Sequence, residues 1–231
     1  MHYGQFCPIA KATEILGERW TILILRELLM GGRRFSELQR GLGDISPALL
    51  TSRLKSLEDQ GIVVRRRISG QRGFEYFPTA ACEAFLPVAL SIGEWGLSFA
   101  RHLLVEEDFD VDFLMYYLER SVDPTQLPGD ETVVQFRFID LVEQRDWWLL
   151  IKQDVQICIT PPARDVDVYF TSTLRTMHDV WMGDRTYREA RESDDLIIEG
   201  EPALTRNIMR WLRPSVFFEA ERAPIPACLA A

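Results

Sequence analysis

The chain has 231 residues, of which 47% are hydrophobic and 26% charged, and its formal net charge is −9. This length allows one or two domains, and this composition indicates a globular chain rather than a disordered one. No apolar run approaches the roughly 18 residues that a membrane-spanning helix requires, and the first residues lack the basic and apolar blocks of a signal peptide. We therefore expect a cytoplasmic protein.

Residue types that bind metals or perform catalysis are scattered along the chain. The cysteines and histidines show neither CxxC spacing nor clustering: they are Cys7, Cys82, Cys158, Cys228, His2, His102 and His178. This spacing excludes a zinc framework and a small disulfide scaffold, so we expect no metal and no cofactor. No nucleophile–base pair, glycine-rich phosphate loop or pair of carboxylates at helical spacing stands out, and we do not expect an enzyme.

Charge is distributed unevenly between the two halves. Residues 1–105 contain 13 Lys or Arg and 10 Asp or Glu, a net charge of +3, whereas residues 106–231 contain 13 and 25, a net charge of −12. Residues 19–72 alone contain 11 basic and 5 acidic residues. Such asymmetry is typical of a chain in which one half binds a polyanion, although a solvated basic face gives the same pattern.

The first hundred residues predict a winged helix. Apolar residues at helical spacing predict helices near 9–16, 20–28 and 36–40, and another over 47–60, with Ser46 as N-cap and Pro47 at its first position. Residues 62–68 and 74–77 have strand character and predict a β-hairpin. A last helix extends from Thr79 past Pro87, which must kink or interrupt it, to about Leu104. The recognition helix would be 47–60.

The second half has a different pattern. We expect an acidic linker over 105–112, a helix over 111–121, strands near 131–138, 146–152, 154–159, 166–171 and 196–198, and helices over 172–182 and 202–212. The predicted fold class is therefore α+β. A winged-helix domain over 1–104, for DNA binding and dimerisation, precedes the linker and an α+β domain over 113–231.

The predicted recognition helix and hairpin carry the candidate DNA contacts. Leu50, Leu54 and Leu57 share one face, and the opposite face presents small, hydroxyl and cationic side chains that suit base edges and phosphates. An ordinary amphipathic helix gives the same pattern, but the hairpin adds four arginines within eight residues and no acid, a density that phosphates would neutralise. The candidates are Arg33, Arg34, Ser46, Ala48, Thr51, Ser52, Arg53, Lys55, Arg66, Arg67 and Arg72, with Arg65 as the fourth hairpin cation.

Several segments together resemble the HxlR-type family of bacterial regulators over about residues 5–98. They are Cys7 to Ala10, Gly17 to Leu28, Arg34 to Leu38, Ile45 to Pro47, Leu50, Arg53-Leu54, Leu57-Glu58, Gly61 to Val63 and Glu94 to Gly96. The resemblance implies a homodimer, formed through the first and last helices, that binds a twofold-symmetric operator in double-stranded DNA. Family members often carry Lys or Arg at the position of Ala48 and Gln at that of Ser52, so the operator sequence stays open.

The resemblance also draws attention to Cys7. Some members of the family use the matching cysteine to sense oxidants or electrophiles. This role requires an exposed thiol of lowered pKa, and the positive charge of Lys11 or Arg19 could lower the pKa of Cys7. The alternative is a small apolar residue packed at a dimer interface.

Residues from about 110 to 215 resemble the sterol-carrier-protein-2-like fold. The resembling segments lie at 148–151, 155–159, 166–170, 173–177, 180–184, 197–200 and 208–212. The resemblance implies a sheet and helices around an apolar cavity for hydrophobic ligands. Candidate cavity residues are Phe136, Phe138, Trp148, Ile157, Phe170, Leu174, Met177, Trp181 and Trp211, which would equally suit a packed core.

Two functions remain open at this point. In the first, the chain is a DNA-binding transcriptional regulator, without membrane attachment, whose second domain gates DNA binding when a hydrophobic effector binds. In the second, it is a carrier of hydrophobic ligands that uses the winged helix for dimerisation. The arginine-rich hairpin favours the first.

Overall fold

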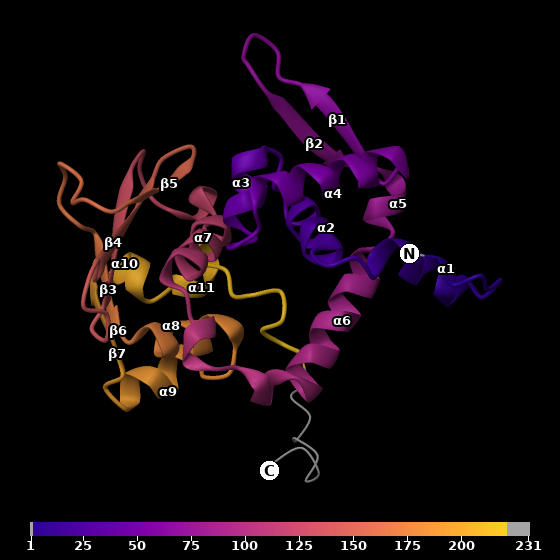
Figure 1. The fold of residues 1–231 in the computed structure, drawn as a ribbon. Coiled ribbons are helices and arrows are strands. Elements are labelled where there is room, and N and C mark those ends of the chain that lie inside the picture. Colours follow the sequence, from indigo (N-terminus) through magenta and orange to yellow (C-terminus); the bar gives the residue numbers. More distant parts are fainter. Residues whose placement is uncertain (1, 221–231) are drawn as a thin grey trace. The chain divides into compact units, whose positions relative to one another are not determined.

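The computed structural model describes residues 2–220 and divides the chain into two compact units between Trp95 and Gly96 (Figure 1). The first unit is built mainly of helices with one hairpin, and the second contains a five-stranded sheet. Among the described residues, no helix combines the length and the apolarity needed to cross a membrane.

The first unit has the element order of a winged helix. The elements are α1 Pro8–Leu16, α2 Thr21–Leu29, α3 Phe35–Arg40, α4 Pro47–Asp59, β1 Val63–Arg67, β2 Phe74–Pro78, α5 Ala80–Glu83 and α6 Leu86–Phe99, the last of which continues past the division. Ser46 caps α4 as expected, since its Oγ accepts a hydrogen bond of 3.3 Å from the Leu49 N–H. The predicted winged-helix fold is confirmed.

The core of the first unit forms around α2 and α4. Leu50, Leu54 and Leu57 are buried together, as their i, i+4, i+7 spacing requires. They belong to one apolar cluster with α2 residues that include Ile24 and Leu28, both fully buried. At about 25 cal/mol per Å², burying one leucine contributes roughly 1.5–3 kcal/mol, so this cluster holds the unit together.

The segment after the hairpin departs slightly from the prediction. The helix expected from Thr79 to about Leu104, with a kink or interruption at Pro87, is two helices that separate just before this proline: α5 ends at Glu83, and α6 begins at Leu86 with Pro87 as its second residue. A proline is tolerated in the first helical turn, where its missing N–H has no intrahelical partner. After α6 come two short 3-10 helices, η1 Arg101–Leu103 and η2 Glu106–Asp108.

The second unit consists of a mixed sheet packed with helices. Its further elements are α7 Val111–Ser121, η3 Pro124–Gln126, β3 Thr132–Phe138, β4 Asp146–Ile151, β5 Val155–Cys158, β6 Val168–Ser172, α8 Leu174–Met182, α9 Tyr187–Glu192, β7 Leu196–Gly200, α10 Pro202–Thr205 and α11 Ile208–Trp211. The strand order is β5-β4-β3-β6-β7, and the central pair β3 and β6 is parallel while the other pairs are antiparallel.

The helix α9 is absent from the elements predicted above, although its start carries a local signal. Thr186 and Glu189 form a capping box: the Thr186 Oγ1 accepts from the Glu189 N–H at 3.1 Å, and the Glu189 carboxylate accepts from the Thr186 N–H at 2.8 Å. A Thr-x-x-Glu sequence before a helix is a recognised N-terminal pattern. With only six residues, α9 is too short for its periodicity to stand out.

The acidic segment 105–112, which the sequence analysis expected to be a linker, packs within the second unit. Phe109 contacts the core of this unit, and its ring meets that of His178 edge to face with centroids 5.0 Å apart. The Arg175 guanidinium lies 4.4 Å from the Phe109 ring centroid and 3.8 Å from the Glu106 carboxylate. Aromatic and charged contacts therefore attach this segment to α8.

Gly200 is the glycine on which the edge of the sheet depends most. Its φ of +133° is one that other residues rarely adopt, and a Cβ there would lie 2.2 Å from the Asp167 carbonyl oxygen. We expect Gly200→Ala to lower the free energy of unfolding of the second unit by about 3 kcal/mol or more, through strain and steric overlap. Urea unfolding followed by tryptophan fluorescence measures it, since four of the six tryptophans lie in this unit.

Gly129→Ala is the matched control for this prediction. Gly129 also has a positive φ, of +77°, but a Cβ there would meet no atom within 4 Å. We expect a cost of only about 1–2 kcal/mol from the backbone conformation. Equal losses in the two variants would show that contact with Asp167 does not matter.

Candidate nucleic-acid interface

The helix α4 presents a small, polar face to solvent. Ala48, Thr51, Ser52 and Lys55 are all exposed, on the side opposite the buried leucines. The Thr51 hydroxyl donates to the Pro47 carbonyl at 2.8 Å, so its oxygen remains able to accept a hydrogen bond. Side chains this short permit a close approach of the helix to base edges in a major groove.

Arg53 does not join this exposed face. Its Nη2 lies 2.7 Å from the Glu18 carboxylate, and its Nε donates to the Arg19 carbonyl at 3.2 Å. The side chain is 23% exposed. Arg53 therefore links α4 to the turn between α1 and α2, whereas the sequence analysis placed it among the candidate DNA contacts. No local pattern signals this pair, because the two residues are far apart in the sequence.

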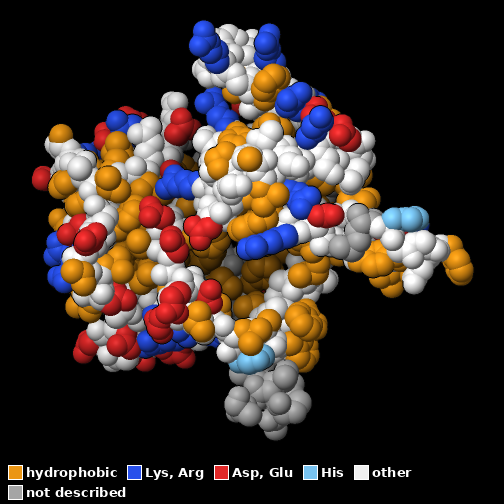
Figure 2. All heavy atoms as spheres, in the orientation of Figure 1, with side chains coloured by type: hydrophobic (Ala, Val, Ile, Leu, Met, Phe, Trp, Pro, Cys, Tyr) orange, Lys and Arg blue, Asp and Glu red, His pale blue; other side chains and the backbone are white. Residues whose placement is uncertain are grey.

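The hairpin of β1 and β2 forms the wing, and its arginines differ in what they contact. Arg65 lies 3.5 Å from the Glu58 carboxylate and 4.5 Å from the Phe74 ring centroid, and Arg66 lies 4.9 Å from that of Phe77. Arg67 and Arg72 are exposed, and neither guanidinium group has an ion pair or hydrogen bond with any described residue. Figure 2 shows Lys and Arg side chains gathered over the wing.

The helix α4 and the wing meet at a groove of about 500 Å³. Its lining includes Thr51 and Lys55 from α4, Arg65 and Tyr76 from the wing, and the acids Glu58 and Asp59. Burial is the largest influence on the Tyr76 phenol and raises its pKa, so the phenol stays neutral at ordinary pH. The fold thus brings together predicted site residues from two separate stretches of sequence.

The paired arginines before α3 have different roles. The Arg33 Nη1 donates to the Leu28 carbonyl, in the last turn of α2, at 2.7 Å and to the Gly32 carbonyl, in the turn after α2, at 2.9 Å. Arg34 is more exposed, and its guanidinium group lies 4.0 Å from the Glu75 carboxylate. The structure therefore places Arg34 beside the wing and occupies Arg33 with backbone carbonyls.

The sequence of this unit matches known proteins. A model of the HxlR-like helix-turn-helix family matches residues 15–103. The uncharacterized HTH-type transcriptional regulator YvaP of Bacillus subtilis is 38% identical over 97 residues, which are 41% of this chain and 90% of YvaP. The chain belongs to the HxlR-like helix-turn-helix family. Its relatives are named as transcriptional regulators, so this is a family of regulators and not of enzymes.

Two further matches show how much of each protein is shared. An uncharacterized HTH-type transcriptional regulator of Mycobacterium tuberculosis, Rv3095, is 39% identical over 89 residues, and the chain spans only 56% of its length. Among solved structures, the reduced form of the transcriptional regulator YodB from B. subtilis is 32% identical. That match covers 40% of this chain and 92% of YodB, with a TM-score of 0.36.

Cys7, the candidate sensing residue in this HxlR-like chain, lies at the N-cap position of α1 and is partly exposed. The two cations considered as its activators are engaged elsewhere: Lys11 bonds to Glu14 at 2.9 Å, and the Arg19 guanidinium lies 5.3 Å from the Trp20 ring centroid. Cys82 is fully buried, and burial raises the pKa of its thiol to about 11. Of these two thiols, Cys7 is the accessible one.

The candidate cavity residues of the second unit lie in or against one packed core, with one exception. Phe136 and Phe170 stack with centroids 4.8 Å apart, and Trp211 meets Phe170 at 6.3 Å. Phe138, Leu174 and Met177 are buried in the same cluster, while Ile157 and Trp181 pack against it. Trp148 pairs with Gln135 across the strands, whereas its neighbours Trp147 and Leu149 belong to the cluster, so Trp148 points to the other face of the sheet. These contacts fit the packed-core alternative.

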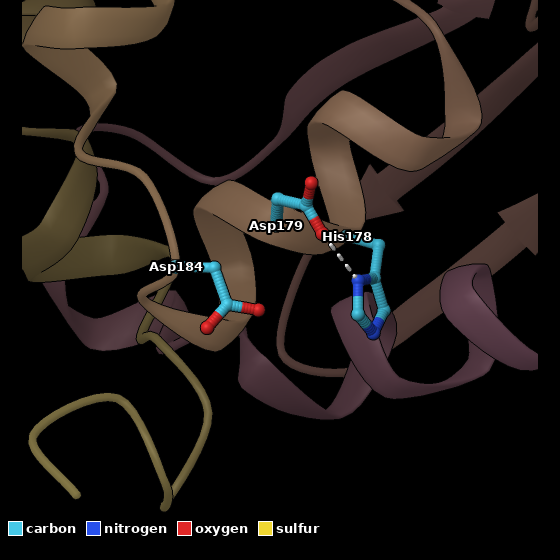
Figure 3. Close-up of side chains that lie close together, drawn as sticks. All are labelled: His178, Asp179 and Asp184. Atoms are coloured by element: carbon cyan, nitrogen blue, oxygen red, sulfur yellow. Dashed lines mark hydrogen bonds and ion pairs between the residues drawn. The ribbon is translucent and has the colours of Figure 1, made fainter. Parts of the chain in front are cut away.

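His178, Asp179 and Asp184 form the one group in the described part of the chain whose ligand atoms lie close enough for a metal, within 4.8 Å (Figure 3). Each carboxylate already has a cation: Arg175 lies 3.4 Å from Asp179, and Arg101 pairs with Asp184. Burial acts to raise the pKa of Asp179, but the His178 hydrogen bond at 3.0 Å and the Arg175 charge lower it. The two arginines therefore provide positive charge at both carboxylates.

Arg33 and Arg34 give a direct test of the division between structural and exposed arginines. We expect Arg33→Gln to lower the free energy of unfolding of the first unit by about 1–3 kcal/mol, because two backbone carbonyls lose a charged donor. Arg34→Gln should cost less than about 0.5 kcal/mol, since its pair is exposed. Thermal unfolding followed by circular dichroism compares them, and a larger loss in Arg34→Gln would contradict the assignment.

Proposed function

We propose that this chain is an HxlR-type transcriptional regulator that binds double-stranded DNA as a homodimer at a twofold-symmetric operator. The exposed face of α4 would enter the major groove, with Ala48, Thr51 and Ser52 near base edges and Lys55 at a phosphate. The observation that carries the proposal is the pair of exposed arginines in the wing, Arg67 and Arg72, for which no described residue provides an acid. DNA phosphates would neutralise them and release counterions, which drives binding.

The distribution of charge supports this assignment to the first unit. Residues 19–72, which include α4 and the wing, contain 11 basic and 5 acidic residues, whereas 106–231 carry a net charge of −12. A surface of negative sign repels phosphate, so we assign the DNA contacts to the winged helix alone. Ser46 would contribute to DNA binding at the start of α4, and Arg34 and Arg66 would bind phosphates beside the wing.

The proposed homodimer would form through α1 and α6. Neither helix contains a buried residue, although both are rich in apolar side chains. Ile9 is 77% exposed, and Val88 and Ile92 are 48% and 42% exposed. Two recognition helices must reach successive major grooves about 34–36 Å apart, which a symmetric dimer achieves.

The second unit would gate DNA binding, as a sterol-carrier-like domain that responds to a hydrophobic effector in the cytoplasm. A ligand shifts a conformational equilibrium only by its difference in affinity for the two states, and a coupling of about 1–3 kcal/mol is typical. The alternative function, a carrier with an inactive winged helix, leaves the wing arginines without a purpose. Binding to the DNA upstream of the protein's own reading frame separates the two.

The wing is tested by the salt dependence of DNA binding. We expect Arg67→Ala and Arg72→Ala each to weaken binding to all DNA sequences and to lower the slope of log affinity against log salt by about 1 unit. Fluorescence anisotropy with the upstream DNA and a random duplex, across a salt series, measures both quantities. Arg164→Ala, which removes an arginine from the second unit, is the control; unchanged affinity and slope in both wing variants would refute the wing assignment.

The same assay separates reading from positioning. Thr51→Ala and Ser52→Ala should cost roughly 1–3 kcal/mol on the operator and much less on random DNA, because hydrogen bonds to base edges carry the sequence information. Equal losses on both duplexes would mean that these residues only position the helix.

Dimerisation is tested by a substitution that places a charged side chain on the apolar surface of α6. Ile92→Asp should raise the dimer dissociation constant about 100-fold or more, because a buried carboxylate would lack a partner, and DNA affinity should fall with it. Sedimentation velocity at micromolar concentration measures the change. Val142→Asp, at an apolar residue that is 89% exposed in the second unit, is the control. A wild-type chain that stays monomeric both free and on DNA excludes the proposed dimer.

A further inference from the structure

A groove of about 790 Å³ lies in the second unit, between α9 and the segment that contains α10 and α11. Its lining is Tyr187, Arg188, Arg191, Glu192, Thr205, Arg206, Asn207, Ile208, Met209 and Arg210. The groove therefore carries four arginines and one acid, within a region whose net charge is strongly negative.

The arginines of this groove differ from the others of the second unit. Arg188 lies 4.0 Å from Glu192, but Arg191, Arg206 and Arg210 are exposed and their guanidinium groups have no ion pair or hydrogen bond among the described residues. Every other arginine from 101 to 213 has a recorded partner: Arg101, Arg120, Arg137, Arg145, Arg164, Arg175, Arg185 and Arg213. In so acidic a region, three arginines without acids on a single groove point to an external anion.

The rest of the lining is suited to an apolar body. Ile208 is buried at the groove, Met209 is 47% exposed, and Tyr187 packs against the core of the unit. Burial raises the pKa of the Tyr187 phenol well above its ordinary value, so the group stays neutral. An inorganic anion would leave these apolar surfaces in water, whereas a ligand with an apolar skeleton would cover them.

We propose that this groove binds a small organic acid, with its carboxylate at Arg191, Arg206 and Arg210 and its apolar skeleton against Tyr187, Ile208 and Met209. The guanidinium group matches a carboxylate with two parallel hydrogen bonds, and the volume lies within the range of small-molecule sites. The inference concerns binding alone and holds whether or not the groove affects DNA binding.

Octanoate titrated into the full chain and followed by calorimetry is the primary test. Octanol, which has the same apolar skeleton without the charge, and inorganic phosphate, which has charge without the skeleton, are the comparison probes. We expect saturable octanoate binding, with octanol and phosphate each at least about tenfold weaker, since a hydrogen bond to a charged group is typically worth that factor or more.

Three variants assign the binding to the groove. Arg206→Gln and Arg210→Gln should each weaken octanoate binding about tenfold, whereas Arg164→Gln, the same change outside the groove, should leave it unaltered. Equal affinity for octanol, equal affinity for phosphate, full binding in both groove variants, or no saturable octanoate binding below about 1 mM would each overturn the proposal.

Discussion

Burial of one row of leucines on α4 determines which face of this helix the first unit exposes to solvent. Leu50, Leu54 and Leu57 anchor α4 in the core against α2, and their burial fixes the rotation of the helix about its axis. The opposite face, with Ala48, Thr51 and Ser52, is consequently exposed. The pairing of Arg53 with Glu18 secures the same rotation from the side. A substitution in this core would therefore change the orientation of the exposed face of α4, even though no residue of that face is replaced.

Arginine has several roles in this chain, and its surroundings decide which one it takes. Arg33 donates to backbone carbonyls and Arg53 to a distant acid, so both stabilise the fold. Arg67 and Arg72, in contrast, extend from the wing without a recorded partner in residues 2–220. Because an unpaired cation in water gains little from the fold, exposed arginines clustered on one element are better explained by an anion that arrives from outside.

The second unit combines a packed apolar core with a separate groove that is lined by exposed arginines. Phe136, Phe170 and Trp211 fill the space between sheet and helices, where the sequence also allowed a ligand cavity. The groove proposed for an organic acid lies elsewhere, between α9 and the segment with α10 and α11; Arg210 lies in α11, and Arg206 directly follows α10. The net charge of the sequence does not indicate this groove, because the acidic residues near these arginines in the sequence give the region a negative charge.

By itself, the sequence determined most of the helices and strands and much of the DNA-binding candidate surface, because helix periodicity, strand alternation and the capping of α4 by Ser46 are local. It also carried the resemblance that the comparisons confirmed for residues 15–103. Only the tertiary structure decided which arginines are free to bind. Arg53 pairs with Glu18 and Arg213 with Asp123, and such partners are far apart in sequence, so no local pattern reveals them. The same reason applies to the groove, whose two walls are brought together by folding alone.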